Sequence, residues 1–334
     1  TGDNNVCVGA RAGEDLVGGN ANVIVGRNAA LNATSMATSV IIGEQAGGGG
    51  VIAGADNVVV GRGSGYSLVA GASNVFIGRN AGLLASDNAD NIVIGAYAMD
   101  AATGGEHYNV AIGTNTLGTE NSNADYCIAI GHNALALQNA NVKNTAIGGL
   151  AGDAITTSSD NTLIGYSAGS ALSTSGAGGF CVAIGGYALD QGTGSSNVAI
   201  GYAALDAAGT HQNCIAIGTS AGGAITDGPG NVCIGHQSGM AMTTGDYNIA
   251  IGMQAADGLV GDANNNIVIG YAALGGCTAA TSSNIAIGTS ALTHASYAAA
   301  NINIAIGQAT GAAITSGTAN VLIGHQAGST IADD

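Results

Sequence analysis

A four-residue pattern recurs nineteen times along this 334-residue chain: a β-branched residue, a spacer, Val or Ile, and then Gly. Successive pattern glycines lie 16 to 20 residues apart. A unit of this length is too short to form its own core, so it must bury apolar side chains against its neighbours. The pattern therefore predicts a single repeat domain over residues 1–334. The pattern glycines are Gly9, Gly26, Gly43, Gly61, Gly78, Gly95, Gly113, Gly131, Gly148, Gly165, Gly185, Gly201, Gly218, Gly235, Gly252, Gly270, Gly288, Gly307 and Gly324.

Positions within a repeat are counted here from this glycine, which is position 0. All nineteen residues at position −3 are β-branched, and all nineteen at position −1 are Val or Ile. Such side chains pack well on a pleated surface, and alternate residues of a strand share one face. Because a coil of about 17 residues must also turn back on itself, we predict an all-β, parallel β-solenoid. It has about 19 coils, a 17–18-residue repeat and the form of a flat roll.

The alternation also suggests which residues form the core. We expect positions −3 and −1 to face the coil interior, which places position −2 on the outer face. Position −2 is never charged, so it predicts an apolar stripe that identical chains around a rotation axis would cover. The predicted core residues are Val23, Val25, Gly26, Ile92, Ile94, Gly95, Val198, Ile200, Gly201, Ile285, Ile287 and Gly288. The candidate chain–chain interface residues are Ile24, Ile41, Phe76, Ala111, Ala129, Ala199, Ala250 and Ala305.

Asn occupies position −4 in fifteen of the nineteen repeats. Two interpretations are open: a turn residue in the left-handed region that bonds its own backbone, or an amide ladder stacked from coil to coil. The exceptions are Ser39, Cys127, Cys181 and Cys214, and exchange with Cys indicates a corner partly closed to water. The nearest two of these cysteines lie two coils apart, about 9.5 Å, so we expect no disulfide framework.

The charge distribution limits the partners. The net charge is −16, and all five basic residues lie within the first 143 positions. Binding to phosphate groups needs a basic surface, so nucleic acid and anionic lipid are not expected partners. No apolar segment is long enough to span a bilayer, so we expect no membrane insertion. At position +1, Arg27, Glu44, Arg62 and Arg79 predict a ladder of opposite charges on neighbouring coils.

We found no pattern of catalytic or cofactor-binding residues, so no enzyme activity and no cofactor are expected. His132, His236 and His325 share position +1, and each could form a three-histidine metal ring around a threefold axis. Other repeats have Tyr, Thr or Gln at the same position, which favours variation of an exposed surface instead. We therefore predict no metal site.

Two runs resemble known repeats: residues 197–205 (Asn-Val-Ala-Ile-Gly-Tyr-Ala-Ala-Leu) and residues 161–169 (Asn-Thr-Leu-Ile-Gly-Tyr-Ser-Ala-Gly). They are similar to the head repeat of trimeric autotransporter adhesins, and more so to the repeats of bacteriophage tail-fibre-like proteins, whose spacing is closer. The resemblance covers nearly the whole chain. It implies a left-handed β-roll, three chains side by side and a location on a virion or cell surface. It also leads us to expect a processed or partial chain.

The expected function is therefore a non-enzymatic, trimeric fibre segment that acts as a shaft or in receptor attachment. The expected partners are further copies of this chain, neighbouring fibre or virion proteins, and a cell-surface receptor or glycan. The alternative is a structural subunit of a head-to-tail extracellular filament or sheath, because unpaired end strands promote such pairing.

Overall fold

A computed structural model describes residues 2–103, 105–119, 124–139, 143–172, 179–276, 280–293, 302–314 and 317–329. Over these residues the chain is an all-β, parallel β-solenoid of nineteen three-residue strands with no helix. It divides into two compact units, one up to Leu163 and the other from Ile164 on. The nineteen parallel strands confirm the predicted β-solenoid, and each strand occupies positions −3 to −1 of its repeat.

The strands are short and regularly spaced along the chain. The first unit contains β1 (Val6–Val8), β2 (Val23–Val25), β3 (Val40–Ile42), β4 (Val58–Val60), β5 (Val75–Ile77), β6 (Ile92–Ile94), β7 (Val110–Ile112), β8 (Ile128–Ile130) and β9 (Thr145–Ile147). β10 (Thr162–Ile164) lies at the division. The second unit contains β11 (Val182–Ile184), β12 (Val198–Ile200), β13 (Ile215–Ile217), β14 (Val232–Ile234), β15 (Ile249–Ile251), β16 (Ile267–Ile269), β17 (Ile285–Ile287), β18 (Ile304–Ile306) and β19 (Val321–Ile323).

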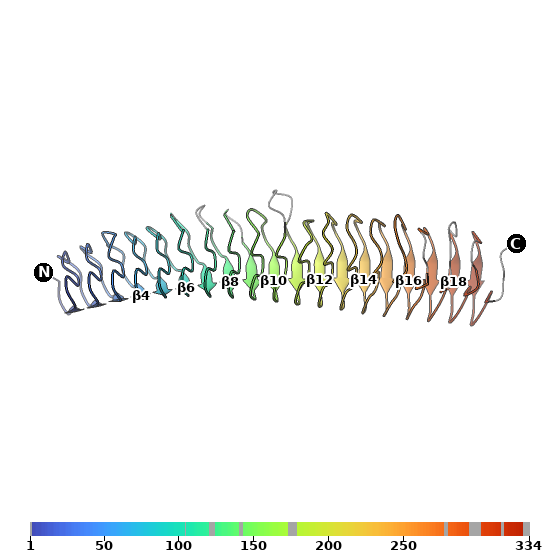
Figure 1. Ribbon diagram of the computed structural model, residues 1–334, viewed down its shortest axis with the longest axis horizontal. Helices are drawn as coiled ribbons and strands as arrows, with labels where there is room; N and C mark the ends of the chain where they lie inside the picture. Colours follow the sequence, from blue (N-terminus) through green and yellow to red (C-terminus); the bar gives the residue numbers. More distant parts are fainter. Residues whose placement is uncertain are drawn as a thin grey trace. The chain divides into compact units, whose positions relative to one another are not determined.

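Within each unit, each strand pairs in parallel with the next one in chain order (Figure 1). The register places equal repeat positions opposite one another, as where Val198 faces Ile215 and Ala199 faces Ala216. The backbone bonds continue beyond the strands: the N–H of Gly201 donates to the carbonyl of Ile184 at 2.8 Å. Residues at the same repeat position therefore lie next to one another in successive coils and form a row along each unit.

The glycine at position 0 is required for two separate reasons. Its φ lies between +129° and +146° in all nineteen repeats, a region that residues with a Cβ rarely adopt. In addition, a Cβ on Gly201 would lie 2.6 Å from the carbonyl oxygen of Gly218 in the next coil. A side chain here would both strain the backbone and force neighbouring coils apart.

The side of the strand that faces the coil interior is the opposite of the predicted one. The residue at position −2 is completely buried in every strand from β2 to β18, whereas Val23 is 36% and Ile92 is 42% exposed. None of the predicted core residues is buried: Val23, Val25, Gly26, Ile92, Ile94, Gly95, Val198, Ile200, Gly201, Ile285, Ile287 and Gly288. All predicted interface residues are core residues instead: Ile24, Ile41, Phe76, Ala111, Ala129, Ala199, Ala250 and Ala305.

The reason for this error is geometric. Alternation along a strand shows which residues share a face, but it does not show which face is covered. The opposite wall of the coil also points inward, with fully buried side chains at position +3 such as Ala81 and Ala221. A three-residue strand then directs one side chain inward and two outward, so the two β-branched residues lie outside.

A second core row lies beyond the turn and is filled in most repeats in one of two ways. In many repeats position +4 is Gly, and a large buried side chain at position +7 fills the space: Leu68, Ile155, Leu172, Ile225, Met242 and Ile314. In others, position +4 is itself a large buried residue with φ near +50°: Met99, Leu117, Leu135, Leu189, Leu205, Leu274 and Leu292. A Cβ on Gly222 would lie 3.0 Å from Cδ1 of Ile225 and 3.2 Å from Cδ2 of Leu205. The two positions therefore share one space.

The Asn residues at position −4 form the stacked amide ladder. Asn248 donates from its backbone N–H and from Nδ2 to Oδ1 of Asn231, at 2.9 and 3.0 Å, and Nδ2 also donates to the carbonyl of Ala263 at 2.7 Å. The left-handed residue of this corner is the one before the Asn, as at Tyr247 with φ of 55°. The turn interpretation was therefore wrong about which residue turns. In the second unit the ladder joins Asn231, Asn248, Asn266, Asn284, Asn303 and Asn320.

Cysteine fits into the same buried corner. The backbone N–H groups of Cys127 and Cys214 donate to Oδ1 of Asn109 and Asn197, at 2.9 and 3.0 Å. No disulfide joins the described cysteines; Cys277 lies outside the described residues. Burial raises the pKa of the Cys214 thiol, so this side chain is a small apolar group of the core.

The shared core space can be tested in the second unit by a double-mutant cycle. Gly222→Leu alone should overpack the space beside Ile225 and lower the free energy of unfolding by about 1–3 kcal/mol. Ile225→Ala alone should leave a cavity and cost about 2–5 kcal/mol. The double variant reproduces the arrangement around Leu205, so it should be more stable than the sum of the single effects, as measured by urea denaturation. Strictly additive losses would contradict a shared space.

Candidate functional site

The strands expose a regular apolar surface. The outer Val/Ile face is defined here as the first and third residue of β2 to β9 in the first unit and of β11 to β18 in the second. Its side chains are half-buried or exposed, for example 37% at Ile77 and 37% at Ile215. Every member is Val or Ile except Thr145, so no charged residue interrupts it. In each unit the face measures about 10 by 38 Å, which matches the largest apolar patch of a typical monomer, about 300–600 Å².

Aromatic side chains border this face at the ends of the strands. In the first unit, Tyr108 stacks on Tyr126 at a centroid distance of 5.1 Å. In the second unit, Tyr187 packs edge-on between Tyr166 and Tyr202, at 5.4 and 5.8 Å. A tyrosine ring is apolar and has a polar tip, so these side chains form a rim between the apolar face and water.

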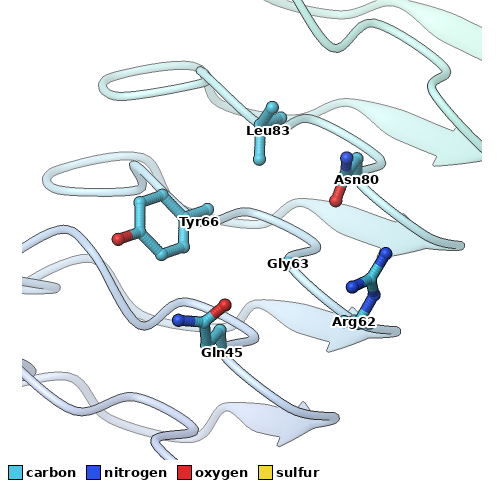
Figure 2. A pocket seen from close by; sticks show the side chains of 6 residues that line it. All are labelled: Gln45, Arg62, Gly63, Tyr66, Asn80 and Leu83. Carbon is cyan, nitrogen blue, oxygen red and sulfur yellow. The ribbon is translucent and has the colours of Figure 1, made fainter.

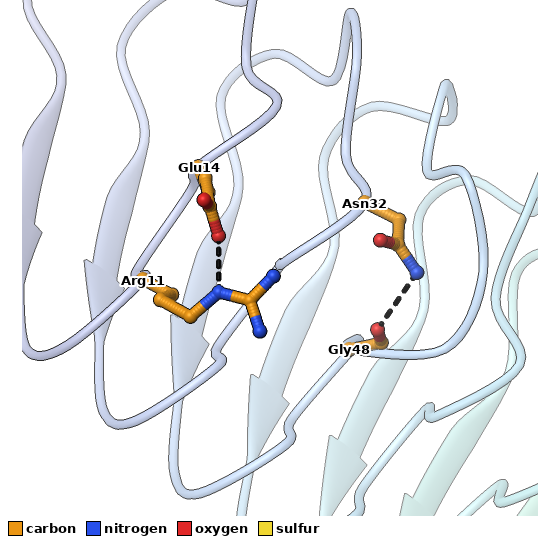
Figure 3. Close-up of polar contacts among 4 residues, drawn as sticks. All are labelled: Arg11, Glu14, Asn32 and Gly48. Carbon is orange, nitrogen blue, oxygen red and sulfur yellow. Dashed lines mark hydrogen bonds and ion pairs between the residues drawn. The ribbon is translucent and has the colours of Figure 1, made fainter.

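Charged contacts in the first unit involve arginines at positions +1 and +2. Arg27 forms an ion pair with Glu44 of the next coil, which confirms part of the predicted charge ladder. The hydrogen bond from Arg27 holds the pKa of the Glu44 carboxyl below its usual value. Figure 3 shows a second pair, Arg11 with Glu14, and also the hydrogen bond from Nδ2 of Asn32 to the carbonyl of Gly48 at 3.2 Å.

The ion pairs of the ladder do not extend to the remaining arginines. Arg79 lies over the ring of Tyr97, with its Cζ 4.5 Å from the ring centroid. Arg62 lies one coil from Glu44, but it forms no ion pair among the residues that the structure describes. Beyond Glu44 the ladder continues only as the charge attraction between Arg62 and Glu44, which also lowers the pKa of that carboxyl. It ends before Arg79, which contacts Tyr97 instead.

No cluster of potential metal ligands forms within a single chain over the described residues, and the three-histidine ring considered above would join three chains. Within the described ranges, no three His, Cys, Asp or Glu side chains lie close enough to hold a metal ion, and this includes His132, His236 and His325. A helix with the length and apolar character for crossing a membrane is also not found in those ranges.

The sequence analysis missed two fully buried titratable residues, Glu106 in the first unit and His211 in the second. His211 has a perturbed pKa. Its ring is fully buried in the second unit and lies against Gly192 of the preceding coil, where a Cβ would be 2.7 Å from Cε1 and Nε2. Neither ring nitrogen has a hydrogen-bond partner of ordinary geometry. Burial lowers the pKa of His211, and an interaction with the backbone of Ile225 offsets this only in part. The sequence feature that could have pointed to this buried histidine is Gly192 in the preceding coil, because its missing side chain makes room for the ring.

The burial of His211 should make stability depend on pH. Its folded-state pKa lies below the ordinary value of 6.5, so the unfolded chain binds the proton more readily. The free energy of unfolding should be unaffected by this histidine above about pH 6.5. On acidification below that pH it should fall by at most about 1.4 kcal/mol per pH unit. His211→Leu should remove this loss, as measured by thermal unfolding of both proteins between pH 7 and 5.

Acidic side chains act in the opposite direction and are the same in both proteins. Burial and the neighbouring Asp190 raise the pKa of Asp206, so its carboxyl favours folding as the pH falls towards its ordinary range. The difference between the wild type and His211→Leu isolates the histidine. A difference that does not change with pH would contradict the assignment.

No protein-family model matches this sequence, and no curated protein matches it either.

Proposed function

We propose that this chain is a non-enzymatic segment of a virion or extracellular fibre, in which three copies associate side by side through the outer Val/Ile face. The segment would serve as a shaft or in receptor attachment. The single observation that carries the proposal is this face, two uninterrupted rows of half-exposed β-branched side chains in each unit. An apolar patch of this size is often functional, and its regular, uncharged rows suit a partner surface that covers them.

Another copy of the same chain is the partner that fits this face best. The side chains of the face repeat every coil, about 4.8 Å apart. A second copy has the same period, so its side chains can interdigitate along a whole unit. A rotation axis parallel to the direction in which the coils stack makes the contact the same at every coil. The number three is supported by the resemblance of the repeats to those of trimeric fibre proteins.

The surface charge supports an extracellular role. A net charge of −16 with only five basic residues suits a soluble surface and does not suit nucleic acid as a partner. The side chains at positions +1 and +2 vary from coil to coil without disturbing the strands. They can therefore recognise a receptor or glycan, or neighbouring fibre proteins, while the fold stays constant.

A head-to-tail filament is the second candidate, and the end strands favour it. In β1, Val6 and Val8 are 51% and 56% exposed; in β19, Val321 and Ile323 are 65% and 68% exposed. The outer edge of each of these strands can accept another strand. In this arrangement the ends, not the outer Val/Ile face, would join the subunits.

The proposal predicts the particle mass. Light scattering with sedimentation should give three times 31.9 kDa for the wild type. The double variant Ile77→Lys, Ile147→Lys should give single chains with an unchanged circular dichroism spectrum, because it places charges on the outer Val/Ile face. The matched control is Val69→Lys, Leu84→Lys, whose positions are equally exposed, 38% and 40%, but lie outside the face.

Each alternative has its own result in this experiment. A monomeric wild type, or a control double variant that dissociates as fully as the face variant, would overturn the side-by-side assembly. Open-ended polymers that persist in the face variant would support the head-to-tail filament instead.

A further inference from the structure

We propose that a notch at Gly63, in the first unit, binds a monosaccharide ring that carries a carboxylate, such as a uronic acid. This sugar would be the receptor group in the attachment role, so the inference rests on the proposed function. It is argued from the shape of the notch, from the polar groups that line it and from its apolar wall.

The notch lies where one repeat has glycine, and so no side chain, at position +2. Position +2 adopts a left-handed conformation in every coil, yet Gly63, with φ of 65°, is the single glycine among the nineteen residues at this position. A cavity of about 270 Å³ lies over Gly63. Oδ1 of Asn80 lies 2.6 Å from where a Cβ of residue 63 would be, so the Asn80 side chain takes up part of the space that a side chain there would occupy. Figure 2 shows the residues that line it: Gln45, Arg62, Gly63, Tyr66, Asn80 and Leu83.

The two side-chain amides of the notch lack the amide–amide bond that some residues at position +2 form. Nδ2 of Asn115 donates to Oδ1 of Asn133 in the next coil at 3.0 Å, which joins two residues at position +2. Gly63 lies between Gln45 and Asn80, which are therefore two coils apart and cannot bond to each other. Gln45 also forms no amide bond to Asn28 in the preceding coil. Within the described residues neither side-chain amide has a hydrogen-bond partner, so both are available to a ligand.

The guanidinium of the notch is also available. The other three arginines have partners: Arg11 has Glu14, Arg27 has Glu44, and Arg79 has the ring of Tyr97. Arg62 is exposed and forms no ion pair or ring contact in the described part of the chain. Its charge also attracts Glu44 of the preceding coil, but that carboxylate is already paired with Arg27. In Figure 2 it lies with Asn80 on one side of Gly63, while Tyr66 lies on the other.

The apolar wall of the notch is held in place by the preceding coil. A Cβ on Gly49 would lie 2.3 Å from Cε1 of Tyr66, so the ring rests directly on a backbone that only glycine permits. The ring is nevertheless 36% exposed, and the half-buried Leu83 lies one coil further on. A fixed aromatic ring binds with little loss of conformational freedom.

Together these groups define the ligand. A guanidinium pairs with a carboxylate, and amides both donate to and accept from hydroxyl groups. The ring of Tyr66 and the side chain of Leu83 can cover the C–H face of a pyranose. The volume lies just below the usual range for small-molecule sites, about 300–1,000 Å³, and therefore suits one sugar ring.

The test fills the notch with the side chain that other repeats have. Asn28 and Asn80 occupy position +2 at φ of 57°, so Gly63→Asn should fold normally. Its Cβ would meet Oδ1 of Asn80 at 2.6 Å, which is the movable end of a side chain. The control is Ala272→Asn, the same change to Asn at position +2 of a coil in the second unit, where φ is 50°.

Methyl β-glucuronide is the probe, titrated into the intact chain and followed by ligand-observed NMR. The wild type and Ala272→Asn should bind it saturably, with a Kd on the order of 1 mM. Gly63→Asn and Arg62→Gln should each weaken binding at least about tenfold, as should replacing the probe by neutral methyl β-glucoside. Acetate at equal concentration should not displace the glucuronide.

Four results would overturn the proposal: no saturable binding by the wild type, unchanged binding by Gly63→Asn, equal binding of the glucoside, or displacement by acetate. The last would indicate a simple carboxylate site. Sedimentation of the same samples separates this inference from the fibre proposal. A monomer that binds the glucuronide would reject the fibre alone, and a trimer that does not bind it would reject the notch alone.

Discussion

The close approach of successive coils at the repeat glycine is the constraint on which the rest of this structure depends. The carbonyl oxygen of the next glycine lies only 2.1–2.7 Å from where a Cβ would be. This spacing lets each coil form backbone hydrogen bonds with both neighbours and keeps equal repeat positions in straight rows. The buried amide ladder, with Asn248 bonded to Asn231, and the aligned core depend on that register.

The narrow interior explains how the molecule separates stability from function. One inward side chain per strand, a small residue at position +3 and the shared space at positions +4 and +7 form most of the core, and residues such as Met36 and Ile52 fill it at other positions. The outer Val/Ile face is then left for association, and positions +1 and +2 are left to vary. Changes there, such as the glycine at position 63, alter the surface without altering the coil.

Much of the fold could be predicted because the repeat presents the same local pattern nineteen times. The strands, their parallel stacking and the need for Gly201 and its equivalents followed from that pattern. The amide ladder was one of two open interpretations, because Asn favours both turns and ladders. The shared core space and the contact of His211 with Gly192 were missed, since each joins residues whose distance depends on how the coil closes. Gly63 could have been noticed as the single glycine in its row.

The sequence alone determined the period, the strands and the register, because these depend on residue types at fixed spacing and on glycine where no side chain fits. The tertiary structure decided which face of the strand is inside, since that depends on what packs against it. Ile24 and Val23 are neighbours of similar character, yet one is fully buried and the other is 36% exposed. That choice moves the candidate interface from position −2 to positions −3 and −1. The tertiary structure also shows the notch at Gly63, because side chains from three different coils line it.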